Sequence, residues 1–288
     1  MFGFFSKKPD NLIGETLDKR YKITKRLGAG GFGDTYLAVD LRSKNNLQRV
    51  IKHLQPKGLS PSERDYVLPK LREMFEREKT VLEALGEAHP SKQIPRMMDH
   101  FEQWNEFFYV QEFIKGETLD DRGHGYMSQR SEANVKLLLV EILEVLAFVH
   151  QHKVVHRDLK PENIMRRTAD QKIVLIDFGA VKDLSNIGLN RNNQPRSSLI
   201  IGTPGYMSPE QEKGQPQLAS DVYAIGALGL HALTGESPTD LLNTHTLAFE
   251  WMHKVTVSPE FAAILNKMVT YRAVDRYGSA VEALQALQ

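Results

Sequence analysis

Two short polar motifs, each next to apolar sequence, constrain this chain most strongly. The first is HRDLKPEN, from His156 to Asn163, and the second is the DFG that begins at Asp177 after the apolar stretch IVLI. The pattern H-R-D-x-x-x-x-N fixes four residues, and at about 5% usage each it arises by chance in roughly two chains per thousand of this size. Asp158 and Asp177 are 177 − 158 = 19 positions apart. This spacing allows a hairpin, and we expect it to bring Asp158, Asn163 and Asp177 together.

A glycine-rich stretch, LGAGGFGDTY, carries G-x-G-x-x-G at Gly28, Gly30 and Gly33. Glycine lets backbone N–H groups approach a phosphate closely, although the same residues also suit a plain tight turn. A dinucleotide-binding fold would place a helix directly after the glycines. Here the segments on both sides, YKITKRL and DTYLAVD, alternate like strands. The pattern therefore predicts the bend of a β-hairpin, and the neighbouring motifs must decide between a turn and a phosphate site.

The pattern of apolar residues along the chain changes near Ile114. Before it, short alternating segments predict strands, and LPKLREMFEREKTVLEALG has the apolar spacing of one helix. After it, leucine-rich segments such as residues 134–152 predict several helices. We expect an α+β chain with an N-terminal extension at 1–20, a small strand-rich lobe at 21–113 and a larger helical lobe at 114–288, the two lobes forming one domain.

The composition of the sequence argues against several classes of protein. The chain has 288 residues, is 41% hydrophobic and 25% charged, and carries a net charge of +1, which argues against a protein built to coat nucleic acid. This sequence contains no cysteine, so disulfides and cysteine-ligated metals are excluded within it. The longest uncharged run, residues 222–235, is too short to span a bilayer and predicts a buried helix. We expect a cytoplasmic protein without a transmembrane segment.

Taken in order, the motifs resemble those of the Hanks-type (eukaryotic-like) serine/threonine protein kinases, most closely the bacterial and cyanobacterial members. Beside the motifs above, the matching segments are VIK at Lys52, IGTPGYMSPEQ from Ile201, DVYAIG at Asp221 and DRYGSA at Arg276. The resemblance runs from about Tyr21 to the C-terminus. It implies a bilobal protein-kinase fold, with a small antiparallel β-sheet lobe that holds one main helix and a larger, mostly helical lobe.

The resemblance implies transfer of the γ-phosphate of ATP, with Mg²⁺, to serine and threonine hydroxyls of proteins. Asp158 corresponds to the residue that orients the hydroxyl and accepts its proton, and Lys160 to the residue that neutralises charge on the transferring group. Asn163 and Asp177 offer the hard oxygen ligands that Mg²⁺ prefers. Lys52 corresponds to the lysine that binds the α- and β-phosphates.

A glutamate on the predicted helix is expected to hold Lys52 in place, and Glu78 is the first candidate. It lies 78 − 52 = 26 positions after the lysine, a longer spacing than is usual in the family. Glu76 and Glu73 are its rivals. Helical phase favours Glu78 because Leu82, one turn later, would face the core beside it.

The resemblance also implies an ATP pocket in which Phe32, at the tip of the glycine loop, closes the site from water, and Gln111 is the gatekeeper before the hinge. The nucleotide-binding residues that it implies are Leu27, Gly28, Ala29, Gly30, Gly31, Phe32, Gly33, Val50, Lys52, Gln111, Glu112, Phe113, Ile114 and Met165. Val50 stands where the family usually has alanine, and Thr35 where it usually has valine. These two departures bear on the affinity for ATP rather than on the charged groups of the chemistry.

Other residues are expected to regulate or support the site. Ser197 and Ser198 are candidate autophosphorylation sites, because the arginine before Asp158 can bind a phosphate on the activation loop. Glu210 and Arg276 are expected to form a structural ion pair. His156 is expected to pack within the core, and the remaining histidines are interpreted as incidental.

Two other function classes stay open at this point. A pseudokinase would bind ATP without transferring phosphate, and a small-molecule kinase of related fold would act on an alcohol that is not a protein. The expected partners are protein substrates and no nucleic acid. A homodimer formed through the small lobes is a further hypothesis.

Overall fold

The computed structural model describes residues 11–30, 33–54, 92–120, 125–178 and 204–288, together with the helical positions 69, 72, 73, 76, 79, 80 and 82–85. The chain forms two compact units. Unit 1 comprises Met1–Glu87 and Pro95–Ile114, and unit 2 comprises Ala88–Ile94 and Lys115–Gln288. The sequence placed the change of lobe between residues 113 and 114, next to the Ile114 that ends unit 1.

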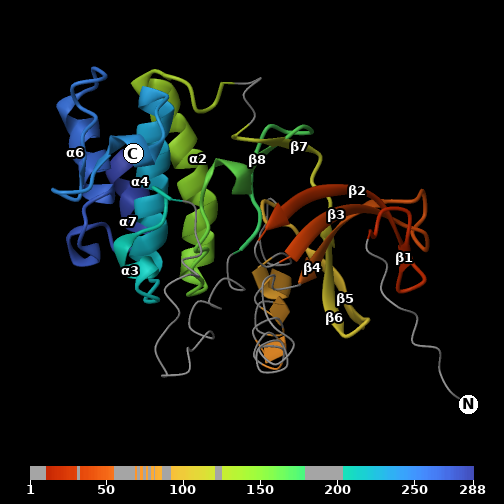
Figure 1. Cartoon of the computed structure of the whole chain (residues 1–288). Coiled ribbons are helices and arrows are strands. Elements are labelled where there is room, and N and C mark those ends of the chain that lie inside the picture. Colours follow the sequence, from red (N-terminus) through yellow and green to blue (C-terminus); the bar gives the residue numbers. More distant parts are fainter. Residues whose placement is uncertain are drawn as a thin grey trace, which may run out of the picture. The chain divides into compact units, whose positions relative to one another are not determined.

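Unit 1 is built on a six-stranded antiparallel sheet with the strand order β1-β2-β3-β4-β6-β5 (Figure 1). Its strands are β1 (Thr16–Leu17), β2 (Tyr21–Gly30), β3 (Gly33–Asp40), β4 (Gln48–Leu54), β5 (Met97–Gln103) and β6 (Glu106–Glu112). Alternation decides which face of β3 is buried, since Tyr36 and Ala38 lie in the core while Leu37 and Val39 are only half-buried. Strand β6 lies between β4 and β5 in the sheet, and it is buried along almost its whole length.

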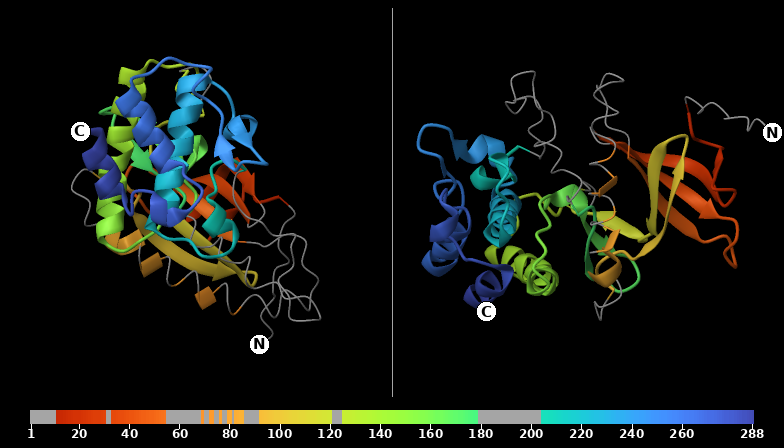
Figure 2. Two further views of the ribbon diagram at one scale, coloured as in Figure 1. Left: turned by 90° about the vertical axis from the view of Figure 1, so that its left-hand side faces the viewer. Right: turned by 90° about the horizontal axis from the view of Figure 1, so that it is seen from below.

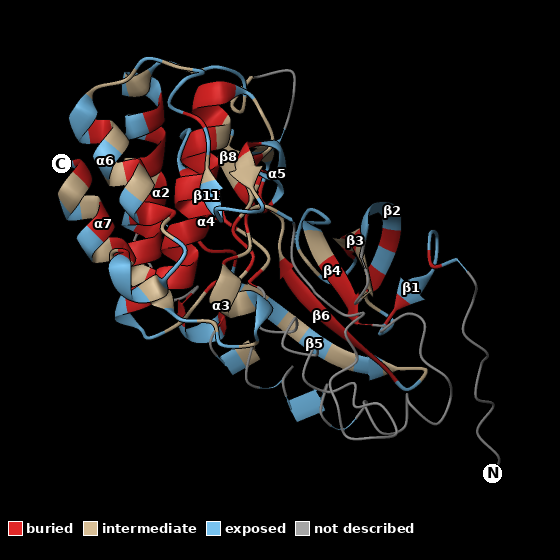
Figure 3. Ribbon diagram, turned by 60° about the vertical axis from the view of Figure 1, so that its left-hand side comes forward, coloured by how far each residue is buried: buried red, intermediate tan, exposed pale blue. Residues whose placement is uncertain are grey.

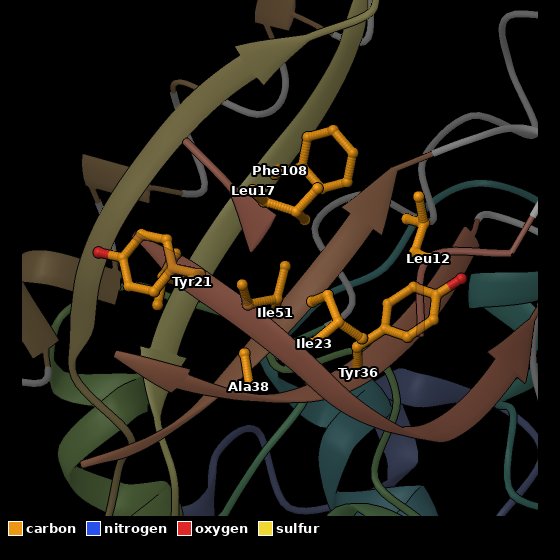
Figure 4. Packing of buried hydrophobic residues seen from close by; sticks show 9 residues of the cluster. Leu12, Leu17, Tyr21, Ile23, Tyr36, Ala38, Ile51 and Phe108 are labelled. Atoms are coloured by element: carbon orange, nitrogen blue, oxygen red, sulfur yellow. The ribbon is translucent and has the colours of Figure 1, made fainter. Parts of the chain in front are cut away.

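The core of unit 1 includes residues from before Tyr21. Figure 4 shows Leu12 and Leu17 beside Ile23, Ile51 and the other side chains of the same cluster. Leu17 has no exposed surface, and its strand β1 pairs with β2 in antiparallel register. The described part of the segment that was expected to be an extension, residues 11–20, is therefore built into the sheet through β1 and into the core through Leu12 and Leu17.

A polar network lies on the same sheet. Arg20 donates to both carboxylate oxygens of Asp40 at 2.8 Å and to Asp99 at 3.0 Å, and the Tyr21 hydroxyl donates to Asp99 at 2.6 Å. Burial and the hydrogen bond to Asp99 raise the pKa of Tyr21, so its hydroxyl remains a donor at neutral pH. The network ties β5, which carries Asp99, to β2 and β3.

Unit 2 combines two small sheets with helices (Figure 2). Strands β7 (Gly116–Thr118), β8 (Ile164–Arg167) and β9 (Ile173–Leu175) form an antiparallel sheet, and β10 (Leu242–Asn243) pairs with β11 (Ala248–Phe249). The helices are α2 (Glu132–Gln151), η1 (Pro161–Asn163), α3 (Pro209–Glu212), α4 (Leu218–Thr234), α5 (Pro238–Leu241), α6 (Pro259–Met268), η3 (Ala273–Asp275) and α7 (Ala280–Leu287).

Helix α4 is the buried centre of unit 2, and Figure 3 shows it coloured as buried along its length. This confirms the buried helix predicted from the uncharged run. Close packing depends on its glycines, because a Cβ at Gly226 would lie 2.7 Å from Val269, and one at Gly229 would lie 3.0 Å from Leu139. The helix ends at Gly235, whose φ of 74° suits a residue without a Cβ. Within the described ranges, no helix combines the length and apolar character needed to cross a membrane.

Candidate active site

Asp158 lies in a tight loop between α2 and η1, and it is only 6% exposed. The side-chain nitrogen of Asn163 donates to the Asp158 backbone carbonyl at 2.8 Å and also to its carboxylate. The ammonium nitrogen of Lys160 lies 4.0 Å from the same carboxylate. Asp158 and Asn163 are thus in contact, as expected for two members of the predicted cluster, and Lys160 lies beside them.

The hairpin expected between the two motifs is present as β8 and β9, which pair in antiparallel register. The backbone N–H of Ile176, just after β9, donates to the Asn163 carbonyl at 2.9 Å. Asp177 follows directly and has a left-handed φ of 60°. The hairpin therefore places the backbone of Asp177 next to Asn163, close to the loop that carries Asp158.

His156 packs in the core, as predicted. Its side chain has no exposed surface, and its Nε2 lies 3.1 Å from the Ile176 carbonyl, to which an Nε2–H would donate. Its ring lies 4.3 Å from the ring of Phe178, measured between centroids. These contacts join the start of the Asp158 loop to the segment around Asp177.

Asp221 on α4 holds the backbone of the loop that carries Asp158. One of its carboxylate oxygens accepts the N–H of His156 at 2.7 Å, and the other accepts the N–H of Arg157 at 2.9 Å. Asp221 is buried, and His150 on α2 also pairs with it at 3.0 Å. The second ring nitrogen of His150 accepts the N–H of Ala280, the first residue of α7, at 3.0 Å. The interpretation of His150 as incidental was wrong, because it joins three helices to the loop.

The ion pair expected between Glu210 and Arg276 is present, with two hydrogen bonds of 2.7 and 3.0 Å. The Arg276 side chain has no exposed surface. Burial raises the pKa of Glu210, but hydrogen bonds from Arg276 and Ser220 outweigh burial and leave that pKa below its usual value. The pair fixes α3, which ends the IGTPGYMSPEQ segment, to the N-terminal end of α4.

In unit 1, the glycine-rich stretch forms the bend of a β-hairpin, as predicted. Gly28 pairs with Thr35 and Gly30 pairs with Gly33 across β2 and β3. The φ of Gly33 is 147°, which favours a residue without a side chain. A Cβ at Gly28 would meet no atom of the described residues within 4 Å, so packing among them does not explain this glycine. The space beside Gly28 would allow a ligand to approach its backbone closely.

Lys52 lies on β4 between Thr35 of β3 and Tyr109 of β6. It is only 8% exposed, and its ammonium nitrogen lies 5.5 Å from the centre of the Tyr109 ring. Glu78 lies outside the described residues, so its pairing with Lys52 stays a prediction. Of its rivals, Glu76 has a side chain that is 52% exposed and pairs with Lys79 at 3.4 Å.

The remaining residues of the predicted ATP pocket are divided between the two units. Of those in unit 1, Leu27 is exposed, Gln111 and Ile114 are buried, and Val50, Glu112 and Phe113 are half-buried. Met165 lies in unit 2 on β8 and is half-buried. Gly31, Phe32, Ser197 and Ser198 lie outside the described residues.

Two side-chain pairs were missed by the sequence reasoning, which interpreted their histidines as incidental. His53, next to Lys52 on β4, is buried, stacks on Phe108 and lies 2.6 Å from Glu106. In unit 2, Tyr206 and His231 are joined by a hydrogen bond of 2.6 Å. Neither pair has a local sequence signal, because the partners are far apart in the chain.

Comparisons with known proteins agree with the motifs. The family model "Protein kinase domain" matches residues 21–287. Serine/threonine-protein kinase PknA of Nostoc sp. is 38% identical over 279 residues, which cover 95% of this chain and 48% of PknA. Serine/threonine-protein kinase C of Synechocystis sp. is 40% identical over 275 residues, which cover 94% of this chain and 50% of that kinase. The chain spans about half the length of these curated relatives.

A solved structure, the apo form of PpkA-294, matches with a TM-score of 0.74. The match covers 96% of this chain and 98% of PpkA-294 at 23% sequence identity, so it bears on the fold alone. The predicted α+β protein-kinase fold is thereby confirmed. Together with the family model and the motifs in order, the fold shows that this chain belongs to the protein kinase family.

Proposed function

We propose that this chain is a protein serine/threonine kinase that transfers the γ-phosphate of ATP to hydroxyl groups of proteins. The observation that carries the proposal is the arrangement around Asp158. Its carboxylate is held by Asn163, lies 4.0 Å from the Lys160 ammonium, and sits on a loop bonded to the strand that leads to Asp177. Phosphoryl transfer depends mainly on positioning and charge stabilisation, and such an arrangement supplies both.

Each residue has a chemical task in this proposal. Asp158 accepts the proton of a serine or threonine hydroxyl and aligns its oxygen with the γ-phosphorus. The new O–P bond forms as the bond from the γ-phosphorus to the β,γ-bridging oxygen breaks, and ADP leaves. Lys160 neutralises charge on the phosphoryl group in transit. Lys52 holds the α- and β-phosphates as a point charge.

The donor set fits a magnesium ion. Because the side-chain nitrogen of Asn163 is used by Asp158, its amide oxygen is the atom left to bind a cation. The half-buried carboxylate of Asp177 would supply a second hard oxygen ligand. When bound, Mg²⁺ neutralises phosphate charge and orients the transferring group. Asn163 would then have two tasks, because it would orient Asp158 and ligate the metal.

The test is phosphate transfer from radiolabelled ATP to casein in the presence of Mg²⁺. We expect Lys52→Ala and Asp158→Asn each to lower the rate by at least about 100-fold, because each removes a charged group from the reacting centre. The matched controls are the exposed residues Lys172→Ala and Asp240→Asn, which should retain the wild-type rate. Full activity in both site variants would show that the assignment is wrong.

The same assay separates the alternative functions. Mg-ATP binding in a thermal-shift titration without any transfer would favour a pseudokinase. Transfer to a small alcohol but to no protein would favour a small-molecule kinase. Autophosphorylation at Ser197 or Ser198, a cytoplasmic location and pairing of two copies remain predictions that need their own measurements.

A further inference from the structure

The residue before Asp158 has an unfavourable backbone conformation. Arg157 has a φ of 69°, in the left-handed region that a residue with a Cβ rarely adopts. Such a conformation persists only when the surrounding structure holds it in place. The contacts that hold Arg157 therefore also set the direction in which the Asp158 side chain leaves the loop.

Two side chains form hydrogen bonds with the backbone of Arg157, one with its N–H and one with its carbonyl. Asp221 accepts its N–H at 2.9 Å, and the side-chain nitrogen of Gln211 donates to its carbonyl at 2.6 Å. That carbonyl belongs to the peptide bond between Arg157 and Asp158. Gln211 therefore contacts the peptide group from which the Asp158 side chain departs, and Asp221 alone cannot fix the rotation of that group.

Gln211 is itself held firmly, because it lies on α3 next to the anchored Glu210. Glu210 is bound by Arg276 at 2.7 and 3.0 Å and by the Ser220 hydroxyl at 2.6 Å. Gln211, Arg157 and Asp158 also line one small hollow in unit 2. An amide is the suitable group here, since it is a neutral donor that can reach a carbonyl without placing a charge beside Asp158.

We propose that Gln211 is a positioning residue, which orients Asp158 for proton acceptance by holding the Arg157 carbonyl. The inference rests on the proposed kinase function and adds a residue to its machinery. It links the segment IGTPGYMSPEQ directly to the loop that carries Asp158. Without the Gln211 donor, the peptide group between Arg157 and Asp158 would keep, among the described contacts, only the longer bond from the Asp158 N–H to His156 Nδ1, at 3.4 Å. Asp158 would then be oriented less firmly, which lowers the turnover rate while leaving ATP binding to other residues.

The experiment compares the full chain with Gln211→Met, which keeps the side-chain length but removes the donor. Casein is the phosphate acceptor, and kcat, the KM for ATP and the thermal unfolding midpoint are measured for each protein. We expect kcat to fall about 10- to 100-fold with the KM for ATP changed less than about 2-fold. The exposed Gln215, four positions further on, is the matched control, and Gln215→Met should behave like the wild type.

A second variant, Gln211→Glu, keeps the shape but places an acceptor against the carbonyl, and it should lose kcat in the same way. Unchanged kcat in a folded Gln211→Met would overturn the inference while leaving the kinase function intact. Unfolding of both variants would also overturn it, because Gln211 would then be needed for the fold. A wild-type chain that transfers no phosphate would instead contradict the kinase function on which the inference rests.

Discussion

At the scale of single residues, the hydrogen bond between Tyr206 and His231 is sensitive to pH. Burial, and then the charges of Glu162 and Asp120, raise the pKa of Tyr206, so its hydroxyl stays protonated and donates to Nδ1 of His231. Burial lowers the pKa of His231 below 6.5, its ordinary value, despite the opposing charge of Asp120. His231 is therefore neutral in the folded chain at pH 7, as its role of acceptor requires.

This predicts a loss of stability in mild acid. Between the lowered folded pKa of His231 and its unfolded pKa near 6.5, the unfolded chain binds more protons, so the free energy of unfolding falls as the pH falls. We expect His231→Gln, which keeps an acceptor for Tyr206, to lose less stability than the wild type between pH 7.5 and 5.5. Urea unfolding at the two pH values measures the difference, and equal losses would contradict the role given to His231.

The buried pair of Arg276 and Glu210 gives a second prediction at this scale. Arg276→Met should lower the free energy of unfolding by about 3 kcal/mol or more, because it leaves the Glu210 carboxylate desolvated without its partner. The matched control is Arg272→Met, whose side chain is 72% exposed and lies 3.6 Å from Asp275. Surface pairs of this kind contribute about 0–1 kcal/mol. Equal effects of the two substitutions in urea unfolding would show that burial does not decide the strength of the pair.

At the scale of elements, the short strand β1 contributes more than its length suggests. Leu17→Ala should destabilise the chain by about 2–5 kcal/mol, because Leu17 is fully buried in the core of unit 1. The control is Ile13→Ala in the same segment, since Ile13 is 48% exposed. Thermal or urea unfolding measures both. A Leu17→Ala protein as stable as the Ile13→Ala protein would mean that this segment is dispensable for folding.

The elements that the sequence predicted well are those with a local signal. Strand β4 was predicted with its observed bounds from QRVIKHL, and α2 differs by two residues at its start and one at its end. Strand β5 was not predicted, because the inward-facing Asp99 breaks the apolar alternation and is satisfied by Arg20 and Tyr21, which lie far away in the sequence.

The contacts of the candidate site also divide into those that have a sequence signal and those that have none. The motifs predicted that Asp158 and Asn163 are in contact, and the resemblance predicted the pair of Glu210 and Arg276. Nothing in the sequence pointed to Gln211, because its contact with Arg157 spans 54 positions and depends on a left-handed backbone that no motif encodes. Contacts of this kind are decided by the packing of helices, and they emerge only when the fold is known.

At the scale of the whole molecule, the central question is whether the chain phosphorylates protein hydroxyls. The chain spans about half the length of the curated relatives that it matches, so its substrates and partners within a longer protein are a separate question. The proposed transfer chemistry can be measured on the chain itself.

The most direct measurement is mass spectrometry of the chain after incubation with Mg-ATP and dephosphorylated casein, beside the Asp158→Asn protein. We predict phosphoserine or phosphothreonine on the wild-type chain or on casein and none with Asp158→Asn. Phosphate on Ser197 or Ser198 would in addition support autophosphorylation of that segment. A folded wild-type chain that binds Mg-ATP but leaves every serine and threonine of both proteins unmodified would contradict the account.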